Sequence, residues 1–368
     1  MMSRFNVGGT SQWLFQLSSG LTNEKIENLL VIGNCPAHER EDQRINEINH
    51  RRLKGLGPKT SFLLTFQAFL QLRTIIKEFK PDIINTHTSK AGVLGRLASK
   101  TVRTKASVVH TYHGHVLSGY FSKPIETAIK LIEKFLSHMT DYYLVSGAKV
   151  LEDIKDVGII RGRNVMTIWP AVPDYAIRDR KELREKLGIT PNEIVIGWLG
   201  RKVPIKRIDR ILETADQLPD VKFLIAGDGE SIRETFPKFF SSNKGKNVIE
   251  LGFSTPAEVW SISDIAILTS DNEAMPISPI EAALASVPVI AVDSGATREV
   301  MVDGITGILC PKDSSSIISA TKNLARDEAL RSKMGIAARK LAVSRFSPQS
   351  SVQRQLEGYQ AALKAKHG

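Results

Sequence analysis

Cysteine is nearly absent from this sequence, which has two cysteines in 368 residues. Cys35 and Cys310 lie far apart and match no metal-ligand spacing, so the sequence excludes a disulfide framework and a cysteine-rich zinc site. A reducing, cytoplasmic compartment is the expectation that follows. Long apolar runs are also missing, and none approaches the roughly 20 residues that a membrane-spanning helix needs. The first residues lead into a Gly-Gly turn and lack an apolar core, so we expect no signal peptide.

Positive charge is in excess. Lysine and arginine outnumber aspartate and glutamate by 50 to 39, which gives a net charge of +11. Most of the excess lies in residues 1–170, which hold 23 basic and 14 acidic residues, whereas residues 171–368 hold 27 and 25. A basic half suits nucleic acid, an anionic membrane surface or an acidic ligand. Because no aromatic-rich RNA motif or basic recognition helix is present, we expect no nucleic-acid partner.

Short apolar runs alternate with helical patterns along the chain, which predicts an α/β fold with parallel strands covered on both faces. Strands are expected at 27–33, 81–87, 107–113, 142–146 and 164–169, and then at 193–199, 221–226, 248–252, 265–270, 287–292 and 306–310. Helices are expected at 61–79, 91–101, 123–138, 147–156 and 207–218. A polar helical segment at about 316–366 ends the chain.

A proline-containing segment, residues 169–173, separates two arrays of similar size. Two arrays predict two doubly wound, Rossmann-like domains that face each other across a cleft. The expected boundaries are 1–172 and 173–345, with a C-terminal helix at about 346–366 packing back on the first domain.

One expected strand is missing at the start of the chain. Gly8-Gly9 opens a helical pattern, and such a turn normally follows a strand. Only six residues precede Val7, and they do not form an apolar run of strand length. Two interpretations stay open: the coding start lies further upstream, or the N-terminal sheet lacks the strand that usually sits at its centre.

Two carboxylates stand eight positions apart in the stretch DNEAMPISPIEAALASVPVIAVDSGATREV, residues 271–300. Glu273 is expected in the loop after a strand, and Glu281 in the first turn of a helix that begins near Pro279. In a parallel sheet both would lie beyond the carboxyl ends of the strands, where such folds bind ligands. Carboxylates that accept hydroxyls, beside a helix N-terminus that favours anions, suit a sugar nucleotide.

A basic loop and several glycines follow neighbouring strands of the second array. Gly200, Arg201 and Lys206 belong to the segment GRKVPIK, whose cations suit a diphosphate. The segments Gly227-Asp228-Gly229 and Gly252-Phe253 end the next two strands, where glycine lets a ligand approach the backbone. Each feature alone is equally typical of a surface turn.

Histidines gather at corresponding strand ends of the first array, in HTSKAG (87–92) and HTYHGH (110–115). Four histidines within thirty residues favour a functional site over single structural histidines. Zinc is the alternative, but no matching cysteine or carboxylate ligand set lies nearby. We therefore expect no metal.

Basic and aromatic residues occur together at 51–59 and at 118–138. One interpretation is a solvated basic loop before a core helix. The other is docking on an anionic bilayer, where each lysine or arginine near the surface adds about 1 kcal/mol.

With these residues taken together, the chain resembles the retaining glycosyltransferases of family 4 (glycosyl transferases group 1), which have the two-domain GT-B fold. The likeness covers nearly the whole chain. The matching motifs are Glu273-x7-Glu281 with Pro276, PVIA at 288–291, Gly295-x3-Glu299, GRKVPIK at 200–206, GDG at 227–229, HTSKAGVLGRLA at 87–98 and HTYHGH at 110–115.

The resemblance implies a role for each matching residue. Glu281 would bind the donor ribose, and Glu273 the donor sugar near the reacting carbon. Arg201 and Lys206 would neutralise the diphosphate leaving group, and His113 would reach the donor sugar. The further implied donor-binding residues are Gly200, Gly227, Asp228, Phe253, Ala274, Met275, Pro276 and Ile277. The implied acceptor-side residues are Gly8, Gly9, Thr88, Lys90 and His115.

The implied chemistry is transfer with retention, without a metal, a cofactor or an enzymic nucleophile. Asp271-Asn272-Glu273 looks like a metal-binding triplet, but the resemblance makes that the weaker interpretation. The sequence departs from the family pattern at Ala274, Ser286 and Ala296, where the family has glycine. If Ala274 adopted a positive φ, the donor loop would be strained by roughly 1 kcal/mol or more.

The expected function is transfer of a sugar from a nucleotide diphosphate, with UDP as the family-weighted guess, to a lipid-linked or polysaccharide acceptor. Such a step belongs to the synthesis of lipopolysaccharide, capsule or exopolysaccharide. The expected location is the cytoplasm, at the inner face of the plasma membrane. A sugar-nucleotide epimerase and a weak or inactive nucleotide-sugar-binding homologue are the alternatives.

Overall fold

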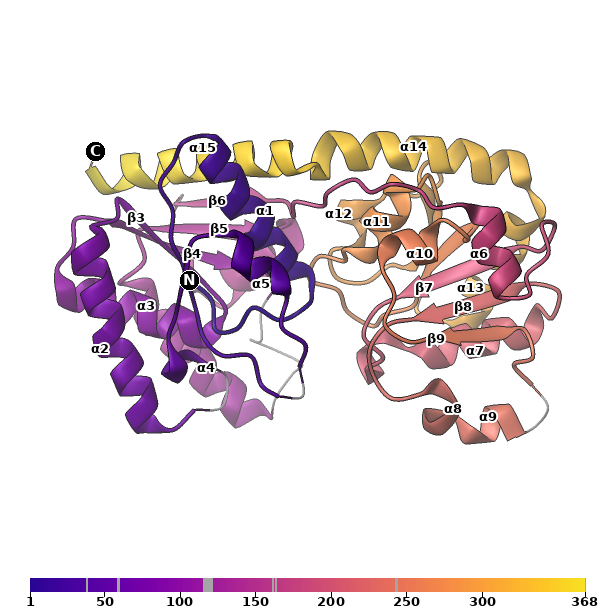
Figure 1. Cartoon of the computed structure of the whole chain (residues 1–368), viewed down its shortest axis with the longest axis horizontal. Helices are drawn as coiled ribbons and strands as arrows, with labels where there is room; N and C mark the ends of the chain where they lie inside the picture. Colours follow the sequence, from indigo (N-terminus) through magenta and orange to yellow (C-terminus); the bar gives the residue numbers. More distant parts are fainter. Residues whose placement is uncertain are drawn as a thin grey trace. The chain divides into compact units, whose positions relative to one another are not determined.

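The computed structural model describes residues 1–37, 39–57, 60–114, 122–160, 162, 164–241 and 244–367. The chain divides into two compact units, each an α/β structure with parallel strands (Figure 1). The first unit comprises Met1–Val172 and Pro348–Gly368, and the second comprises Pro173–Ser347.

The second unit is built on one six-stranded parallel sheet with the order β12-β11-β10-β7-β8-β9. Its strands are β7 (Val195–Leu199), β8 (Lys222–Ala226), β9 (Val248–Leu251), β10 (Ile265–Leu268), β11 (Val289–Val292) and β12 (Gly307–Cys310). Its helices are α6 (Arg180–Lys186), η3 (Pro204–Lys206), α7 (Ile208–Gln217), α8 (Ile232–Thr235), α9 (Pro237–Ser241), α10 (Pro256–Trp260), α11 (Ser278–Leu284), α12 (Thr297–Val300), α13 (Ser314–Arg326) and α14 (Glu328–Phe346).

Alternating side chains of the central strand β7 fill the cores on the two faces of this sheet. Ile196 and Trp198 pack with Ile211 of α7 on one face, and Val195 packs with Trp260 of α10 on the other. This two-residue period on a strand that is apolar throughout is expected when helices cover both faces.

The first unit contains two separate sheets instead of one. Strands β3 (Ile83–His87), β4 (Ser107–Tyr112), β5 (Tyr142–Ser146) and β6 (Val165–Ile168) form a four-stranded parallel sheet, and β1 (Leu30–Ile32) pairs with β2 (His50–Arg52). The other elements are α1 (Gly9–Asn23), η1 (Gln43–Glu47), η2 (Lys54–Leu56), α2 (Phe62–Phe79), α3 (Ser89–Val102), α4 (Lys123–Ser137), α5 (Ala148–Asp156) and α15 (Pro348–His367).

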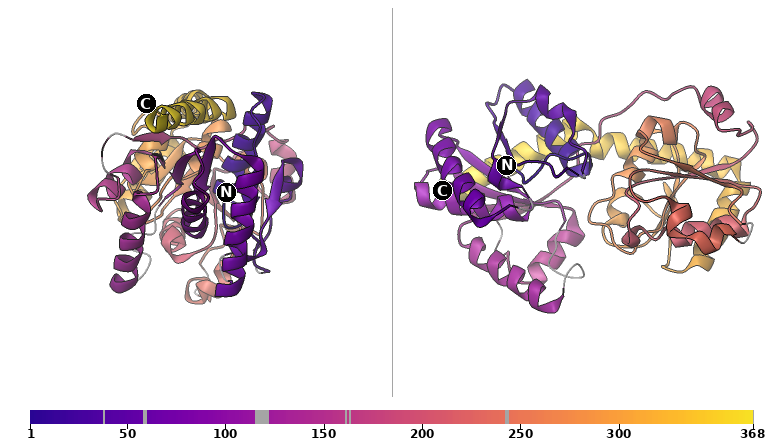
Figure 2. Two further views of the ribbon diagram at one scale, coloured as in Figure 1. Left: turned by 90° about the vertical axis from the view of Figure 1, so that its left-hand side faces the viewer. Right: turned by 60° about the horizontal axis from the view of Figure 1, so that its bottom comes forward.

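The C-terminal helix α15 belongs to the first unit, although α14 before it belongs to the second. It lies beside α1 and against β4, β5 and β6 (Figures 1 and 2). Ser107 donates to the carbonyl of Ala362 (3.0 Å), and Asn85 donates to the hydroxyl of Tyr359 (2.8 Å). These bonds fix the helix on the sheet.

Two expectations about local structure need correction. The basic segment at 51–59, expected as a loop, begins inside β2 and continues into η2, and residues 58–59 lie outside the described residues. Ala274 is absent from the residues with positive φ, so the donor loop carries no strain there. The positive φ occurs instead at Ser286 (φ 59°), after α11. A glycine fits that conformation without the penalty that a Cβ brings.

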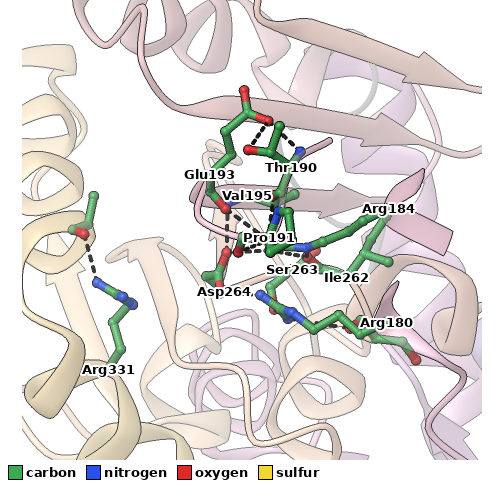
Figure 3. Close-up of polar contacts among 12 residues, drawn as sticks. Arg180, Arg184, Thr190, Pro191, Glu193, Val195, Ile262, Ser263, Asp264 and Arg331 are labelled. Carbon is green, nitrogen blue, oxygen red and sulfur yellow. Dashed lines mark hydrogen bonds and ion pairs between the residues drawn. The ribbon is translucent and has the colours of Figure 1, made fainter. Parts of the chain in front are cut away.

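A half-buried carboxylate, that of Asp264, fixes α6 to the amino ends of β7 and β10. Asp264 accepts from the Arg184 guanidinium (2.7 Å), the Val195 amide (2.8 Å) and the Arg180 guanidinium (Figure 3). Arg184 is only 3% exposed, and it also donates to the carbonyls of Ile262 and Glu193. A buried guanidinium with this many partners depends on its counter-charge.

We expect Asp264→Ala to lower the free energy of unfolding by about 3–5 kcal/mol, because it leaves the Arg184 charge buried without a partner. The matched control is Glu182→Ala, which breaks the exposed pair with Lys186 and should cost about 0.5 kcal/mol or less. Urea denaturation of both variants measures the difference. Equal losses would contradict the structural role of Asp264.

Candidate functional site

The strand order of the second unit creates a switch point between β7 and β10. The chain runs outward from β7 through β8 to β9, and then returns to form β10, β11 and β12 on the other side of β7. Loops that leave the carboxyl ends of β7 and β10 therefore diverge, and open α/β sheets bind ligands at such a divergence.

The loops after β7, β8 and β9 are joined by backbone hydrogen bonds. The Gly200 amide donates to Ala226 (3.1 Å), the Lys202 amide to Asp228 (2.7 Å) and the Gly227 amide to Gly252 (3.0 Å). Gly227 has φ 126°, and a Cβ there would lie 1.9 Å from the Gly200 carbonyl oxygen. Only glycine allows this close approach, so the sequence-predicted residues at these strand ends are held together.

Glu273 lies in the loop after β10 and directly contacts the basic loop after β7. Its Oε1 accepts from Nζ of Lys206 (2.5 Å) and from the Ser270 hydroxyl (2.6 Å). Its carbonyl accepts from the Ala296 amide (2.8 Å), and a Cβ at Gly295, where φ is 55°, would lie 2.0 Å from that oxygen. Both the carboxylate and the backbone of Glu273 are therefore fixed.

The three cations of the basic loop have different surroundings. Lys202 is 7% exposed at its side chain and donates to Glu250 (2.7 Å), so its charge is neutralised within the fold. Lys206 is 23% exposed and is paired with Glu273. Arg201 is exposed, and its guanidinium has no partner among the described residues. Arg201 and Lys206 are consequently the cations that an anionic ligand can reach.

Glu281 is a buried carboxylate, and no cation in the described part of the chain pairs with it. It lies in the first turn of α11, is 7% exposed, and accepts no hydrogen bond at its carboxylate from any described residue. Burial raises the pKa of the Glu281 carboxyl from its ordinary value of 4.5 to about 7. The Tyr175 hydroxyl donates to its backbone carbonyl (2.5 Å) and holds the turn in place. Such a carboxylate has its full hydrogen-bonding capacity available to a ligand.

The other predicted donor-side residues lie in the same loops. Asp228 is exposed after β8, and the Phe253 side chain after β9 is 47% exposed. Ala274, Met275, Pro276 and Ile277 form the link between Glu273 and α11, and of these Pro276 is buried. Because α11 has only seven residues, positive charge at this site comes mainly from Arg201 and Lys206.

In the first unit, the predicted residues converge at the carboxyl ends of β3 and β4. His87 Nδ1 and His113 Nε2 are 2.8 Å apart, and the His113 ring meets the Trp13 ring edge-on at 4.6 Å. Burial lowers the pKa of His113 to about 3 and holds the pKa of His87 well below its usual range, so both rings are neutral. Nδ1 of His113 is buried and has no partner among the described residues.

Thr88 adopts a strained backbone conformation (φ 66°, ψ 155°) between β3 and α3. Its hydroxyl is held by the amide and the hydroxyl of Ser3 (3.1 and 2.9 Å), and the Ser3 hydroxyl also accepts from the Ala91 amide. A threonine in this region costs on the order of 1–3 kcal/mol, and such residues cluster at functional sites.

The remaining acceptor-side residues are not all brought together. Gly8 caps α1 and Gly9 begins it, and no atom of the described residues lies within 4 Å of a Cβ built at Gly8, leaving out its chain neighbours. Lys90 instead donates to the carbonyl of Gly57 (2.9 Å) and to the Thr60 hydroxyl, so its ammonium is occupied within the unit. His115 lies outside the described residues.

Sequence reasoning missed three residues that shape these sites. Ser270 orients Glu273, Trp13 contacts His113, and Ser3 restrains Thr88. Ser270 is the last residue of the strand expected at 265–270, directly before the acidic loop. Its position at this strand end could have identified it as a partner of Glu273 from the sequence. The contacts of Trp13 and Ser3 bring together distant parts of the chain, and no local pattern reveals them. In the described part of the chain, no cluster of three or more histidine, cysteine or carboxylate side chains is arranged to hold a metal ion.

Two family patterns match the chain almost end to end. The pattern described as Glycosyltransferase Family 4 matches residues 7–174, and Glycosyl transferases group 1 matches residues 179–341. The chain belongs to this glycosyltransferase family. The structure of Anabaena HepE in complex with UDP and glucose superposes with a TM-score of 0.80 at 19% identity, covering 96% of each chain, and identifies the fold as GT-B.

Two curated relatives of this glycosyltransferase come from Escherichia coli. One is UDP-Gal:alpha-D-GlcNAc-diphosphoundecaprenol alpha-1,3-galactosyltransferase, which is 26% identical over 73% of each chain. The other is the O-antigen biosynthesis glycosyltransferase WbnH, which is 24% identical over 82% of each chain.

The raised pKa of Glu281 predicts a specific pH dependence of stability. A carboxyl whose pKa is raised on folding contributes stability that is complete below about pH 4.5 and is lost as the pH rises through about 7. Glu281→Gln cannot titrate, so between pH 4.5 and 8 the wild type should lose on the order of 3 kcal/mol relative to this variant. Urea denaturation of both proteins across this pH range measures the difference. If the free energies of unfolding of the wild type and of the variant change in parallel with pH, folding does not raise the pKa of Glu281.

Proposed function

We propose that this glycosyltransferase moves a sugar, with retention and without a metal, from a UDP-sugar to a lipid-linked glycan acceptor. The observation that supports the donor half most directly is the Lys206–Glu273 contact at the β7/β10 switch point, in the same loop as Arg201, which pairs with no residue that the structure describes. A diphosphate needs cations, and a sugar needs hydrogen-bond acceptors. The Lys206–Glu273 pair provides one cation and one carboxylate, which are joined by a single hydrogen bond.

In the proposed reaction, the bond between the anomeric carbon and the diphosphate oxygen breaks as the acceptor hydroxyl oxygen bonds to the same face of that carbon. The acceptor proton passes to a phosphate oxygen of the departing nucleoside diphosphate. The main requirement is stabilisation of the negative charge that builds on the leaving phosphate. Arg201 is available for this as a bidentate donor, and Lys206 as a compact charge.

The two carboxylates take different parts in this proposal because their surroundings differ. Glu281, buried and unpaired, accepts the donor ribose hydroxyls. Glu273, fixed by Ser270 and Lys206, accepts sugar hydroxyls near the anomeric carbon while it orients the lysine toward the phosphate. His113, held neutral in the first unit, serves as a hydrogen-bonding group for the sugar.

The choice of UDP and of a lipid-linked acceptor draws on the relatives. HepE has been crystallised with UDP, and the first E. coli relative is named for UDP-Gal and for a diphosphoundecaprenol acceptor. The O-antigen relative agrees with a role in surface glycan synthesis.

We expect Lys206→Ala and Arg201→Ala each to lower kcat by roughly 100- to 1,000-fold, because each removes charge from the leaving phosphate in the transition state. The matched control is Lys181→Ala, whose side chain is 80% exposed on α6. Initial rates of sugar transfer from a UDP-sugar give the measurement, with circular dichroism to verify the fold. Wild-type kcat in the Lys206 variant would refute its role.

Incubation of the donor alone separates transfer from epimerisation. A transferase without acceptor at most hydrolyses the donor slowly, whereas an epimerase converts it fully. A protein that binds UDP-sugars without any turnover across an acceptor panel would instead be a nucleotide-sugar-binding homologue.

Exposed apolar side chains on two helices of the first unit support association with a membrane surface. Helix α4 exposes Leu131 (62%) and Phe135 (58%) and also carries Lys130 and Lys134. Helix α2 exposes Phe62 (83%) and Leu63 (73%). An amphipathic helix with apolar and basic residues inserts into the headgroup region of an anionic bilayer. No helix in the described ranges is long and apolar enough to span a bilayer.

We expect the protein to co-sediment with vesicles of phosphatidylcholine plus phosphatidylglycerol more strongly than with phosphatidylcholine alone. The double variant Leu131→Asn, Phe135→Asn should weaken binding to the anionic vesicles by roughly tenfold or more, because it removes buried apolar area. Ile305→Asn is the matched control, since this side chain is 58% exposed in the second unit. Equal binding to the neutral and the anionic vesicles would rule out docking of α4 on an anionic bilayer. An equal loss of binding in the α4 double variant and in the Ile305→Asn control would also rule it out.

A further inference from the structure

One ion pair at the carboxyl ends of the strands takes no part in the proposed reaction. Nζ of Lys202, in the loop after β7, donates to Oε1 of Glu250 on β9 (2.7 Å), and the two side chains are only 7% and 16% exposed. Desolvation offsets most of the attraction within such a pair, so apolar side chains of similar size would often stabilise a fold equally well. Stability alone therefore does not account for this pair.

The carboxylate of Glu250 accepts hydrogen bonds from two other segments of the second unit. Besides Lys202, its Oε1 accepts from the Ile232 amide (3.0 Å), and its Oε2 accepts from the Ser231 hydroxyl (2.8 Å), both at the start of α8. Partial burial opposes ionisation, but the hydrogen bonds from Lys202, Ile232 and Ser231 outweigh it and hold the pKa of the Glu250 carboxyl below its ordinary value. Glu250 is therefore charged at neutral pH, and it joins the loop after β7 and the start of α8 to β9.

Residues 227–230, which connect β8 to α8, lie directly against Lys202. The Lys202 amide donates to the Asp228 carbonyl (2.7 Å). A Cβ at Gly229, where φ is 129°, would lie 2.7 Å from Cβ of Lys202 and 2.9 Å from its carbonyl oxygen, so this contact requires glycine. The ion pair that fixes the Lys202 side chain consequently also restrains the loop that packs on it.

The other side of the same loop is open to ligands. Asp228, Gly229 and Glu230 are exposed, and the Phe253 side chain in the neighbouring loop after β9 is 47% exposed. Exposed connecting loops are ordinarily the most mobile segments of a fold. A loop that is exposed on one side and held by an ion pair on the other is preorganised, because binding a ligand then costs little additional ordering.

A nucleotide donor has a base as well as a diphosphate and a ribose. With the diphosphate at Arg201 and Lys206 and the ribose at Glu281, the base is the part of the donor without binding residues. The loops after β8 and β9 follow the basic loop in the order of the sheet. A base has flat apolar faces and a polar edge, which suit the exposed ring of Phe253 and the exposed carboxylate of Asp228.

We propose that the Lys202–Glu250 ion pair is a positioning device for recognition of the nucleobase. It holds residues 227–230 beside the loop of Phe253 in the conformation that binds the base, and neither Lys202 nor Glu250 touches the donor. The inference rests on the proposed function, in that the ligand is a nucleoside diphosphate sugar.

The test replaces the ion pair by an uncharged pair of similar size, Lys202→Met with Glu250→Gln. Glutamine keeps an acceptor for Ile232 or Ser231 and no charge is left buried, so the thermal midpoint should stay close to that of the wild type. We expect the affinity for UDP, measured by titration calorimetry, to fall roughly tenfold, which corresponds to the loss of one or two hydrogen bonds. The affinity for inorganic pyrophosphate should not change, because the cations that hold it are intact.

Two further variants separate positioning from stability. Lys202→Arg keeps the ion pair and should bind UDP more tightly than the uncharged pair does. Lys222→Met with Glu193→Gln makes the same exchanges in an ion pair at the amino ends of β7 and β8 (3.2 Å), and should leave the affinity for UDP unchanged. In transfer assays, the uncharged Lys202–Glu250 variant should raise KM for the donor and leave kcat nearly unchanged, as expected when ground-state binding is lost.

The same titrations with ADP and GDP show whether recognition of the base is affected. The preference of the wild type for its best nucleotide should narrow in the uncharged variant, whichever base that nucleotide carries. Wild-type affinity and an unchanged preference in a stably folded variant would overturn the proposal, and so would an equal loss of affinity for UDP and for pyrophosphate. Failure of the proposed function would be seen separately, in a wild type that binds none of the three nucleotides.

Discussion

Backbone hydrogen bonds between neighbouring loops are the interaction on which the proposed donor site depends. The Lys202 amide bonds to Asp228, the Asp271 amide to Ile205, and the Ala296 amide to Glu273. Each bond joins the loop after one strand to the loop after an adjacent strand. The loops are therefore held side by side in the same order as the strands of the parallel sheet. The side chain of Glu273, whose carboxylate is fixed by Lys206 and Ser270, is then positioned by the sheet and not by its own loop alone. A site built this way is preorganised before any ligand arrives.

The two carboxylates show how environment separates the functions of identical groups. Glu273 has a lysine and a hydroxyl within 2.6 Å, whereas Glu281 has neither, and only burial acts on it. Glu281 is therefore costly to ionise in the empty protein, and hydroxyl donors from a ligand would lower that cost. Glu273 is already satisfied, so a ligand that engages Lys206 must compete with an internal ion pair. In the proposed donor complex, affinity for the diphosphate would depend on how much more strongly the phosphate interacts with Lys206 than the carboxylate of Glu273 does.

The sequence allowed most strands, their order along the chain and the proximity of Glu273 to Lys206 to be predicted, because each depends on local signals. Buried parallel strands are short apolar runs, and Glu273, Glu281 and Lys206 lie at fixed distances from strand ends. The family resemblance singled out Arg201 and Lys206 from the three cations of the basic loop, but the local pattern could not reveal that Lys202 pairs with Glu250 and Lys206 with Glu273, because both partners come from distant segments. The strand β2 was missed because His50-Arg51-Arg52 carries no apolar pattern and is defined by pairing with β1.

The discontinuous sheet of the first unit also bears on its histidines. Met1 accepts a hydrogen bond from the His87 amide, and Ser3 holds the strained Thr88 and the Ala91 amide at the start of α3. Three residues at the chain's start therefore restrain the end of β3, where His87 meets His113.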